Sequence, residues 1–147
     1  MAIIDQLLEL DRLAVGSLAT IEHHRFIFER LAQAGGRPFA ALVGPRGAGK
    51  TILLRQLRQM TEDSIYVSVD TMDPDEDLFG LVRTLYEDYG ITAVFLDEIH
   101  YIADYASHLK RIYDFLPTRV WFTSSVALSL TATQYDLSRR VQSLALH

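Results

Sequence analysis

The sequence predicts an α/β protein of three layers, in which helices cover both faces of a parallel β-sheet. Short apolar segments bounded by turn residues recur along the chain, as buried parallel strands require. Between them lie longer segments whose apolar residues repeat at helical spacing. Strands that alternate with helices are joined by right-handed crossovers, and these crossovers make the strands parallel.

Two helices are expected before the sheet begins. The first covers residues 1–15, where Ile4, Leu7 and Leu8 share one face. The second covers residues 20–34 and ends at a pair of glycines.

Strands and helices then alternate to the end of the chain. The expected strands are residues 39–43, 64–69, 92–96 and 119–123, with the start of a fifth at 143–146. The expected helices are residues 51–60, 77–89, 107–115 and 134–142. The acidic run at residues 73–77 is expected to form a turn and then a charged first helical turn, which the helix dipole favours.

A complete phosphate-binding pattern, G-x-x-x-x-G-K-[ST], joins the first expected strand to the helix after it. It consists of Gly44, Pro45, Arg46, Gly47, Ala48, Gly49, Lys50 and Thr51. Glycines let backbone N–H groups approach phosphate oxygens, and the new helix adds its positive N-terminal end. Lys50 is expected at the β- and γ-phosphates and the Thr51 hydroxyl at Mg²⁺. The pattern predicts a P-loop NTPase fold that binds ATP or ADP with Mg²⁺.

Two carboxylates, Asp97 and Glu98, follow the third expected strand. The C-terminal ends of parallel strands face the crevice where ligands bind. Asp97 is expected to hold Mg²⁺ through its water shell, and Glu98 to orient or deprotonate the water that attacks the γ-phosphate. The alternative is a strand followed by an acidic helix cap. The chain has no Asn, so it cannot contain the Asn-Lys-x-Asp motif that reads guanine.

The fourth expected strand ends in polar residues. In ATPases with such a sheet, this strand lies between the phosphate-loop strand and the acidic strand and brings a polar side chain to the γ-phosphate. Ser125 or Ser124 fits this role, with Thr123 a weaker candidate, and a Ser/Thr helix cap is the alternative. Arg139 and Arg140 are candidates for an arginine finger, or a solvated pair near a helix C-terminus.

These motifs together resemble a group of archaeal and bacterial ATPases of the AAA+ type. The similar segments are residues 44–57, 67–70, 95–101, 109–114, 123–127 and 137–141. The resemblance implies that Ser125 is the sensor and that Arg140 aligns with the family arginine. This chain departs from the family at His100, Ser124 and Arg139, where the family has Gln, Gly and Gly, and the last change leaves both arginines as candidates.

The expected organisation is a single ATPase core, with helices over residues 1–36 and the nucleotide-binding α/β part over 37–147. Family members continue into a helical or winged-helix segment and a C-terminal domain of poorly known function. The resemblance therefore implies that the chain is either a fragment, the favoured interpretation, or an unusually short relative, and that this domain and the lid over the nucleotide are absent from it. It also implies self-association through the arginine face.

Composition narrows the classes of function. A net charge of −5 argues against a broad basic surface for nucleic acid, although not against a small local patch. Without cysteine, neither a disulfide framework nor a thiolate metal site can form. No apolar run is long enough to span a membrane and no secretory signal is recognisable, so a cytoplasmic location is expected.

The leading functional hypothesis is an Mg²⁺-dependent ATPase module that drives or gates a partner domain. One alternative is a slow nucleotide-dependent switch that assembles through its arginines. A second is a small-molecule kinase, although such kinases seldom carry a carboxylate directly after the metal-binding Asp.

Overall fold

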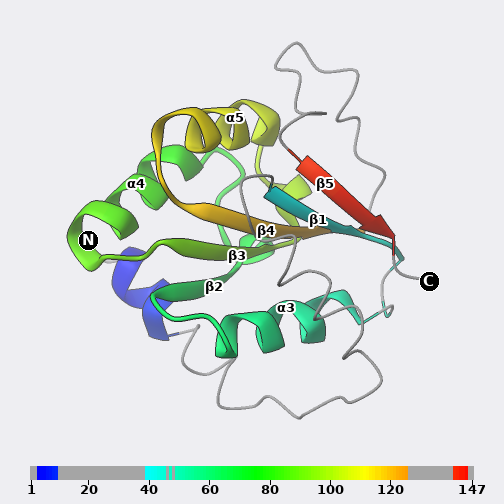
Figure 1. Cartoon of the computed structure of the whole chain (residues 1–147). Coiled ribbons are helices and arrows are strands. Elements are labelled where there is room, and N and C mark those ends of the chain that lie inside the picture. The colour runs from blue at the N-terminus through cyan, green and yellow to red at the C-terminus, as the bar shows by residue number, and fades with distance from the viewer. Residues whose placement is uncertain (1–2, 10–38, 46, 48, 126–140, 146–147) are drawn as a thin grey trace.

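The sheet contains five parallel strands in the computed structural model, which describes residues 3–9, 39–45, 47, 49–125 and 141–145. Their spatial order is β2-β3-β4-β1-β5, and every neighbouring pair is parallel (Figure 1). The strands are β1 (Phe39–Val43), β2 (Ser64–Ser68), β3 (Ala93–Asp97), β4 (Arg119–Ser124) and β5 (Val141–Ala145). The expected place of β4, between the phosphate-loop strand and the acidic strand, is confirmed.

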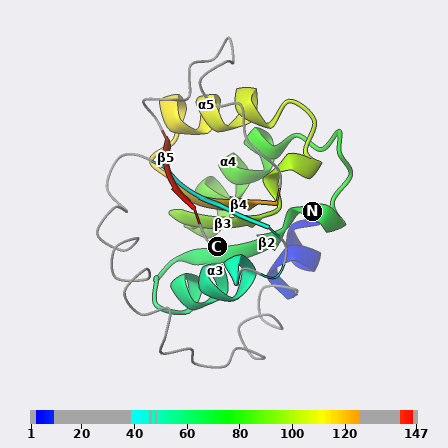
Figure 2. The ribbon, with the colours of Figure 1, turned by 90° about the vertical axis from the view of Figure 1, so that its right-hand side faces the viewer.

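Helices cover both faces of this sheet, as predicted. The helix α3 (Lys50–Gln59) lies on one face, and α4 (Leu78–Tyr89) and α5 (Tyr105–Phe115) lie on the other (Figure 1, Figure 2). Two short 3-10 helices, η2 (Val69–Thr71) and η3 (Ile99–Tyr101), follow β2 and β3. The predicted three-layer α/β class is therefore confirmed.

Strands β1 to β4 are mostly apolar because side chains on both of their faces are buried. Successive side chains of a strand point to opposite faces of the sheet. On β3, Val94 and Leu96 pack in the cluster shared with α4 and α5, while Phe95 packs in the cluster shared with α3. The Phe95 ring stacks on that of Trp121 from β4, with 4.8 Å between their centroids. The core thus fixes β3 and β4 side by side up to their polar ends.

The first expected helix is confirmed over residues 3–9, where Ile4 and Leu7 are buried in the core. The rest of that helix and all of the one expected at 20–34 lie outside the described residues. None of the helices in the described ranges has the length and apolar character needed to cross a membrane.

The fifth strand begins earlier than expected. It starts at Val141, opposite Phe39 in β1, so the helix expected at 134–142 is wrong for its last two residues. Its other residues lie outside the described part of the chain. Backbone pairing along β1 explains the difference, since a local pattern carries no information about a partner strand so distant in sequence.

The acidic run also differs from its prediction. Its residues precede α4 instead of filling the first helical turn, which contains no acidic residue. Asp77 is the N-cap, and its Oδ1 accepts a hydrogen bond from the backbone N–H of Gly80 at 3.1 Å. Asp73 Oδ1 accepts from the N–H of Asp75 at 2.9 Å, which closes the preceding turn. The Asp73 and Asp77 carboxylates thus accept hydrogen bonds from backbone N–H groups, which fixes the turn and the start of α4 more strongly than attraction to the helix dipole alone.

Candidate active site

The phosphate loop follows β1 and leads into α3. Gly47 and Gly49 have φ angles of 84° and 88°, in the left-handed region that side chains rarely adopt. Gly49 is the N-cap of α3, so the free N–H groups of the first helical turn open toward the loop. Arg46 and Ala48, also expected to bind nucleotide, lie outside the described residues. The described glycines Gly47 and Gly49 thus have the backbone that a phosphate cradle requires.

Lys50 is folded over this loop and is only 4% exposed. Its Nζ donates hydrogen bonds to the carbonyl oxygens of Gly44, at 2.6 Å, and Pro45, at 2.8 Å. Two carbonyl dipoles therefore compensate the buried ammonium charge. The structure thus places the Lys50 ammonium group at the phosphate loop, and its contact with the β- and γ-phosphates stays a prediction.

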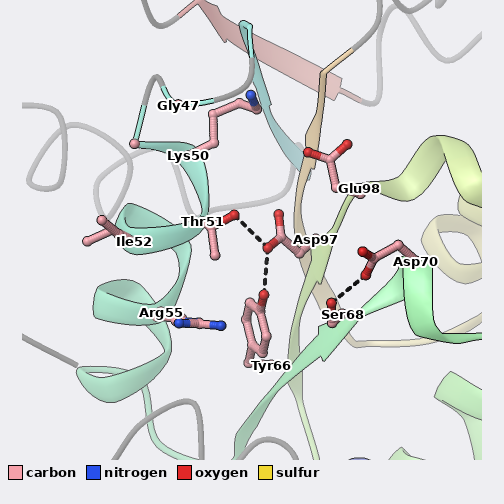
Figure 3. A pocket seen from close by; sticks show the side chains of 11 residues that line it. Gly47, Lys50, Thr51, Ile52, Arg55, Tyr66, Ser68, Asp70, Asp97 and Glu98 are labelled. Carbon is pink, nitrogen blue, oxygen red and sulfur yellow. Dashed lines mark hydrogen bonds between the residues drawn. The ribbon is translucent and has the colours of Figure 1, made fainter. Parts of the chain in front are cut away.

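Asp97, the last residue of β3, receives hydrogen bonds from three hydroxyl groups on three different elements. Thr51 Oγ1 lies 2.8 Å and the Tyr66 hydroxyl 2.5 Å from Asp97 Oδ2 (Figure 3). Thr123 Oγ1 lies 2.5 Å from Asp97 Oδ1. The carboxylate is 4% exposed. Thr51 and Asp97, predicted together as the metal residues, are in direct contact.

Tyr66 remains a hydrogen-bond donor in this arrangement. Burial raises the pKa of its hydroxyl above the usual range, and the negative charge of Asp97 and its hydrogen bond raise that pKa further. The Arg55 guanidinium, 5.1 Å from the ring centroid, lowers the pKa by a smaller amount. The phenol is therefore protonated at neutral pH and can donate to Asp97.

Glu98 turns the chain sharply at the end of β3. Its φ and ψ of 61° and 57° are left-handed, which is uncommon for a residue with a side chain. Its N–H donates to Thr123 Oγ1 at 2.9 Å. Glu98 is the residue before η3, but its side chain makes no capping hydrogen bond there, so the alternative of an acidic side-chain cap is wrong for η3.

The Glu98 carboxylate instead faces the end of β4. Ser125 donates to it twice, from Oγ to Oε1 at 2.6 Å and from the backbone N–H to Oε2 at 3.3 Å. His100 Nδ1 also lies 3.3 Å from Oε2 and 3.1 Å from Ser124 Oγ. Ser125 is thus the candidate sensor that contacts Glu98. Whether a serine caps the next helix concerns residues outside the described ranges, as do the roles of Arg139 and Arg140.

Thr123 is more central than the sequence indicated. It ranks there as the weakest of three candidates, yet its hydroxyl bridges Asp97 Oδ1 and the N–H of Glu98. A threonine at the end of an apolar strand is common, so only the register of β4 against β3 could reveal this contact.

A pocket of about 430 Å³ joins these groups. Its lining is Gly47, Gly49, Lys50, Thr51, Ile52, Arg55, Tyr66, Ser68, Asp70, Asp97 and Glu98. Lys50 and Glu98 lie toward one end and Tyr66 and Arg55 toward the other (Figure 3). Sequence reasoning missed Tyr66, Arg55 and Ser68, and noted Asp70 only through the family resemblance.

The pocket suits a nucleotide phosphate chain with Mg²⁺. Lys50, the loop glycines and the start of α3 supply positive potential for phosphates. The Thr51 hydroxyl and the Asp97 carboxylate are hard oxygen donors 2.8 Å apart, of the kind that Mg²⁺ prefers. In the described ranges no three acidic or histidine side chains gather to form a protein-only metal cage. This small donor set fits an ion that keeps several waters and binds phosphate oxygens.

A phosphate loop after β1 and an acidic pair after β3, with β4 between them, define a P-loop NTPase. Residues 36–147 match the family model described as AAA domain, and the chain therefore belongs to that family. It is an ATPase-like module with the nucleotide-binding fold of AAA+ proteins. No curated protein matches the chain.

Solved structures show the same fold at low sequence identity. AMPPCP-bound DnaA from Aquifex aeolicus is similar with a TM-score of 0.60 at 15% identity, over 90% of this chain and 49% of that one. PCH-2 from C. elegans is similar with a TM-score of 0.53 at 17% identity, over 99% of this chain and 42% of that one. Domain III of Thermotoga maritima DnaA gives 0.55 at 15% identity, over 90% and 66% of the two chains. The chain thus spans about half or less of the two longer proteins.

Proposed function

We propose that this chain binds ATP or ADP with Mg²⁺ and hydrolyses ATP, as the module that drives or gates a partner domain. The observation that carries the proposal is the convergence of Lys50, Thr51, Asp97 and Glu98 on one pocket. The AMPPCP-bound state of the similar DnaA supports nucleotide binding by a chain of this fold.

Lys50 is expected to exchange its two carbonyl partners for phosphate oxygens. The ammonium group keeps hydrogen bonds in both states, so the exchange leaves no buried charge unpaired. The N–H groups of the glycine loop and of the first turn of α3 then surround the same phosphates. Binding by this route requires the lysine charge.

Thr51 and Asp97 would hold the magnesium ion. When bound, Mg²⁺ neutralises charge on the phosphate oxygens and polarises the terminal phosphoryl group. Thr51 would turn its hydroxyl oxygen from Asp97 toward the ion, while Thr123 and Tyr66 keep the Asp97 carboxylate in place.

Glu98 is proposed as the general base. A water attacks the γ-phosphorus, the bond to the β-phosphate oxygen breaks, and ADP leaves while Glu98 accepts the water proton. Ser125, bonded to this carboxylate, is proposed to pass from Glu98 to the γ-phosphate when ATP binds. Arg140, or Arg139, would supply positive charge to a neighbouring copy's site.

A slow nucleotide-dependent assembly switch is the second candidate. It is favoured by the contacts of Glu98, whose carboxylate is already bonded to Ser125 and lies near His100. A base occupied in this way activates water only after these contacts break. The kinase alternative has no comparable support, because Glu98, the proposed general base for water, directly follows Asp97 in the sequence.

The two lysines of the chain allow a matched test of nucleotide binding. Lys50→Ala removes the loop charge, whereas Lys110→Ala removes a surface lysine that pairs with Asp114 on α5. Mg-ATP at a hundredfold excess over Kd should stabilise the wild type by about 2.7 kcal/mol. We expect Lys110→Ala to keep this rise in melting temperature and Lys50→Ala to lose it. An equal rise in both variants would refute nucleotide binding at this loop, and phosphate release without an acceptor would separate hydrolysis from kinase activity.

A further inference from the structure

Tyr66 is the tyrosine among the pocket-lining residues, and it contacts the carboxylate proposed to hold the magnesium ion. Its hydroxyl lies 2.5 Å from Asp97 Oδ2, the same oxygen that accepts from Thr51 Oγ1 at 2.8 Å (Figure 3). An aromatic hydroxyl is therefore adjacent to both proposed metal residues without being one of them.

The position of the Tyr66 hydroxyl is fixed by the sheet and by α3. Tyr66 pairs with Phe95 in the parallel ladder of β2 and β3, two residues before Asp97. Its ring is 3% exposed and packs in the α3-side core, and the Arg55 guanidinium lies 5.1 Å from the ring centroid. Because a tyrosine has few rotatable bonds and this one is packed on all these sides, the hydroxyl is presented to Asp97 in one place.

The three hydroxyl groups that donate to Asp97 fall into two groups. Thr51 is expected to leave Asp97 for the ion, whereas Tyr66 on Oδ2 and Thr123 on Oδ1 are not among the proposed metal residues. These two donors hold the two carboxylate oxygens from different strands, so the carboxylate cannot rotate about its own axis. Once Thr51 has left, each oxygen retains a lone pair for the water shell of the ion.

We propose that Tyr66 is a positioning residue for the magnesium site, whose hydroxyl fixes the Asp97 carboxylate for the ion. The inference rests on the proposed function, and it adds a residue that neither the phosphate loop nor the acidic pair includes. Partners that orient metal-binding carboxylates typically contribute about 10- to 100-fold in metal affinity. The Tyr66 contribution should therefore be found in the metal-dependent part of nucleotide binding.

The variant Tyr66→Phe removes one oxygen atom and keeps the ring in the core. Tyr105→Phe is the matched control, since it removes the same atom from a partly buried tyrosine on α5 outside the pocket lining. Calorimetry would give the ADP affinity with and without Mg²⁺, and electron paramagnetic resonance would give the Mn²⁺ affinity in the presence of ADP. We expect the metal affinity of Tyr66→Phe to fall by about 10- to 100-fold. Metal-free ADP binding should stay unchanged, and Tyr105→Phe should behave as wild type.

Asp97→Asn separates the inference from the proposed function. If Tyr66 acts through Asp97, adding Tyr66→Phe to Asp97→Asn should cause no further loss of metal affinity. A loss in Asp97→Asn together with wild-type metal affinity in Tyr66→Phe would overturn the inference and leave the proposed function intact. Equal losses of metal-free and metal-dependent binding in Tyr66→Phe would also overturn it, since they indicate a structural role. If ADP binding by the wild type did not depend on metal, the proposed metal site would be wrong, and the inference about Tyr66 would be wrong as well.

Discussion

The Ser125 hydroxyl at the end of β4 donates a hydrogen bond to Glu98 Oε1 at 2.6 Å, across 27 positions of sequence. The backbone N–H of Ser125 points to the other oxygen, Oε2, at 3.3 Å. Two strands that the core holds in parallel thus bring the proposed sensor to the proposed base. A change at either residue should therefore affect the other.

We predict that Ser125→Ala lowers ATP turnover while nucleotide affinity stays nearly unchanged. Ser125 is proposed to pass to the γ-phosphate when ATP binds, so the variant loses a hydroxyl that positions the reacting group, and small misplacements of reacting groups cost up to about a hundredfold in rate. Phosphate release under saturating Mg-ATP is the measurement. Ser125→Thr, which keeps the hydroxyl, should retain most of the activity. Wild-type turnover by Ser125→Ala would argue that the Ser125 hydroxyl has no part in catalysis.

Glu98→Gln should bind Mg-ATP as the wild type does but lose hydrolysis. The amide keeps the shape of the side chain and can still accept from Ser125, yet it cannot take a proton from water. Loss of a general base typically costs about 10²- to 10⁴-fold. Binding would be measured by the rise in melting temperature and hydrolysis by phosphate release. Turnover at the wild-type rate would exclude Glu98 as the base.

The proposed exchange of arginines between copies predicts that two inactive variants restore each other. Arg140→Ala lacks the finger, whose loss costs about 10³- to 10⁵-fold in rate, and Glu98→Gln lacks the base. In a mixture, a Glu98→Gln copy can place its Arg140 at the nucleotide site of an Arg140→Ala copy, which still has Glu98. Activity should therefore return in the mixture and rise with protein concentration. Rapid hydrolysis by the monomeric wild type, with no rescue in any mixture, would contradict the exchange of arginines between copies. The same experiment with Arg139→Ala in place of Arg140→Ala identifies which arginine acts.

Stability should fall in mild acid because of His108. Its Nδ1 accepts a hydrogen bond from the N–H of Phe79 at 3.1 Å, and so it must be unprotonated there. Burial lowers the pKa of His108, the nearby Arg111 lowers it further, and Asp77 and Asp104 raise it by less. The unfolded chain, with a histidine pKa of about 6.5, therefore binds more protons than the folded chain below that pH.

The contribution of His108 is thus fully present above about pH 6.5 and is lost as the pH falls toward the lower folded-state pKa. His108→Gln supplies an acceptor that does not titrate. Between pH 7.5 and 5.5, we expect the melting temperature of the wild type to fall more than that of His108→Gln. Parallel pH profiles would show that protonation of His108 is not coupled to folding.

The first four strands can be predicted from sequence because the signal for each is local. Each is a short apolar run between turn residues, and the structure keeps every bound within one residue of its prediction. The beginning of β5 is less visible, since Val141 and Gln142 fit a helical pattern equally well. Only pairing with β1 makes them a strand.

The phosphate loop and the acidic pair are predictable because their chemistry requires fixed residue types at fixed spacing. The hydroxyl contacts around Asp97 are not. Tyr66 lies 31 positions before its partner and Thr123 26 positions after it, and a tyrosine or threonine in a strand has many ordinary roles. Their meeting depends on which strands are neighbours and on the ladder register, which no short segment of sequence encodes.

The order of the strands also constrains when the site can form during synthesis. In the described part of the chain, β1 pairs with β4 on one side and β5 on the other, and both are translated long after it. The phosphate loop and β1 therefore leave the ribosome before either neighbour of β1 has been made. Strands β2 and β3 are nearer in sequence and can pair sooner than β1 can pair with β4 or β5. Closing such long separations costs chain entropy and slows folding. Nascent chains that end before residue 119 should thus expose an apolar, unpaired β1, a segment that chaperones would recognise and that favours aggregation.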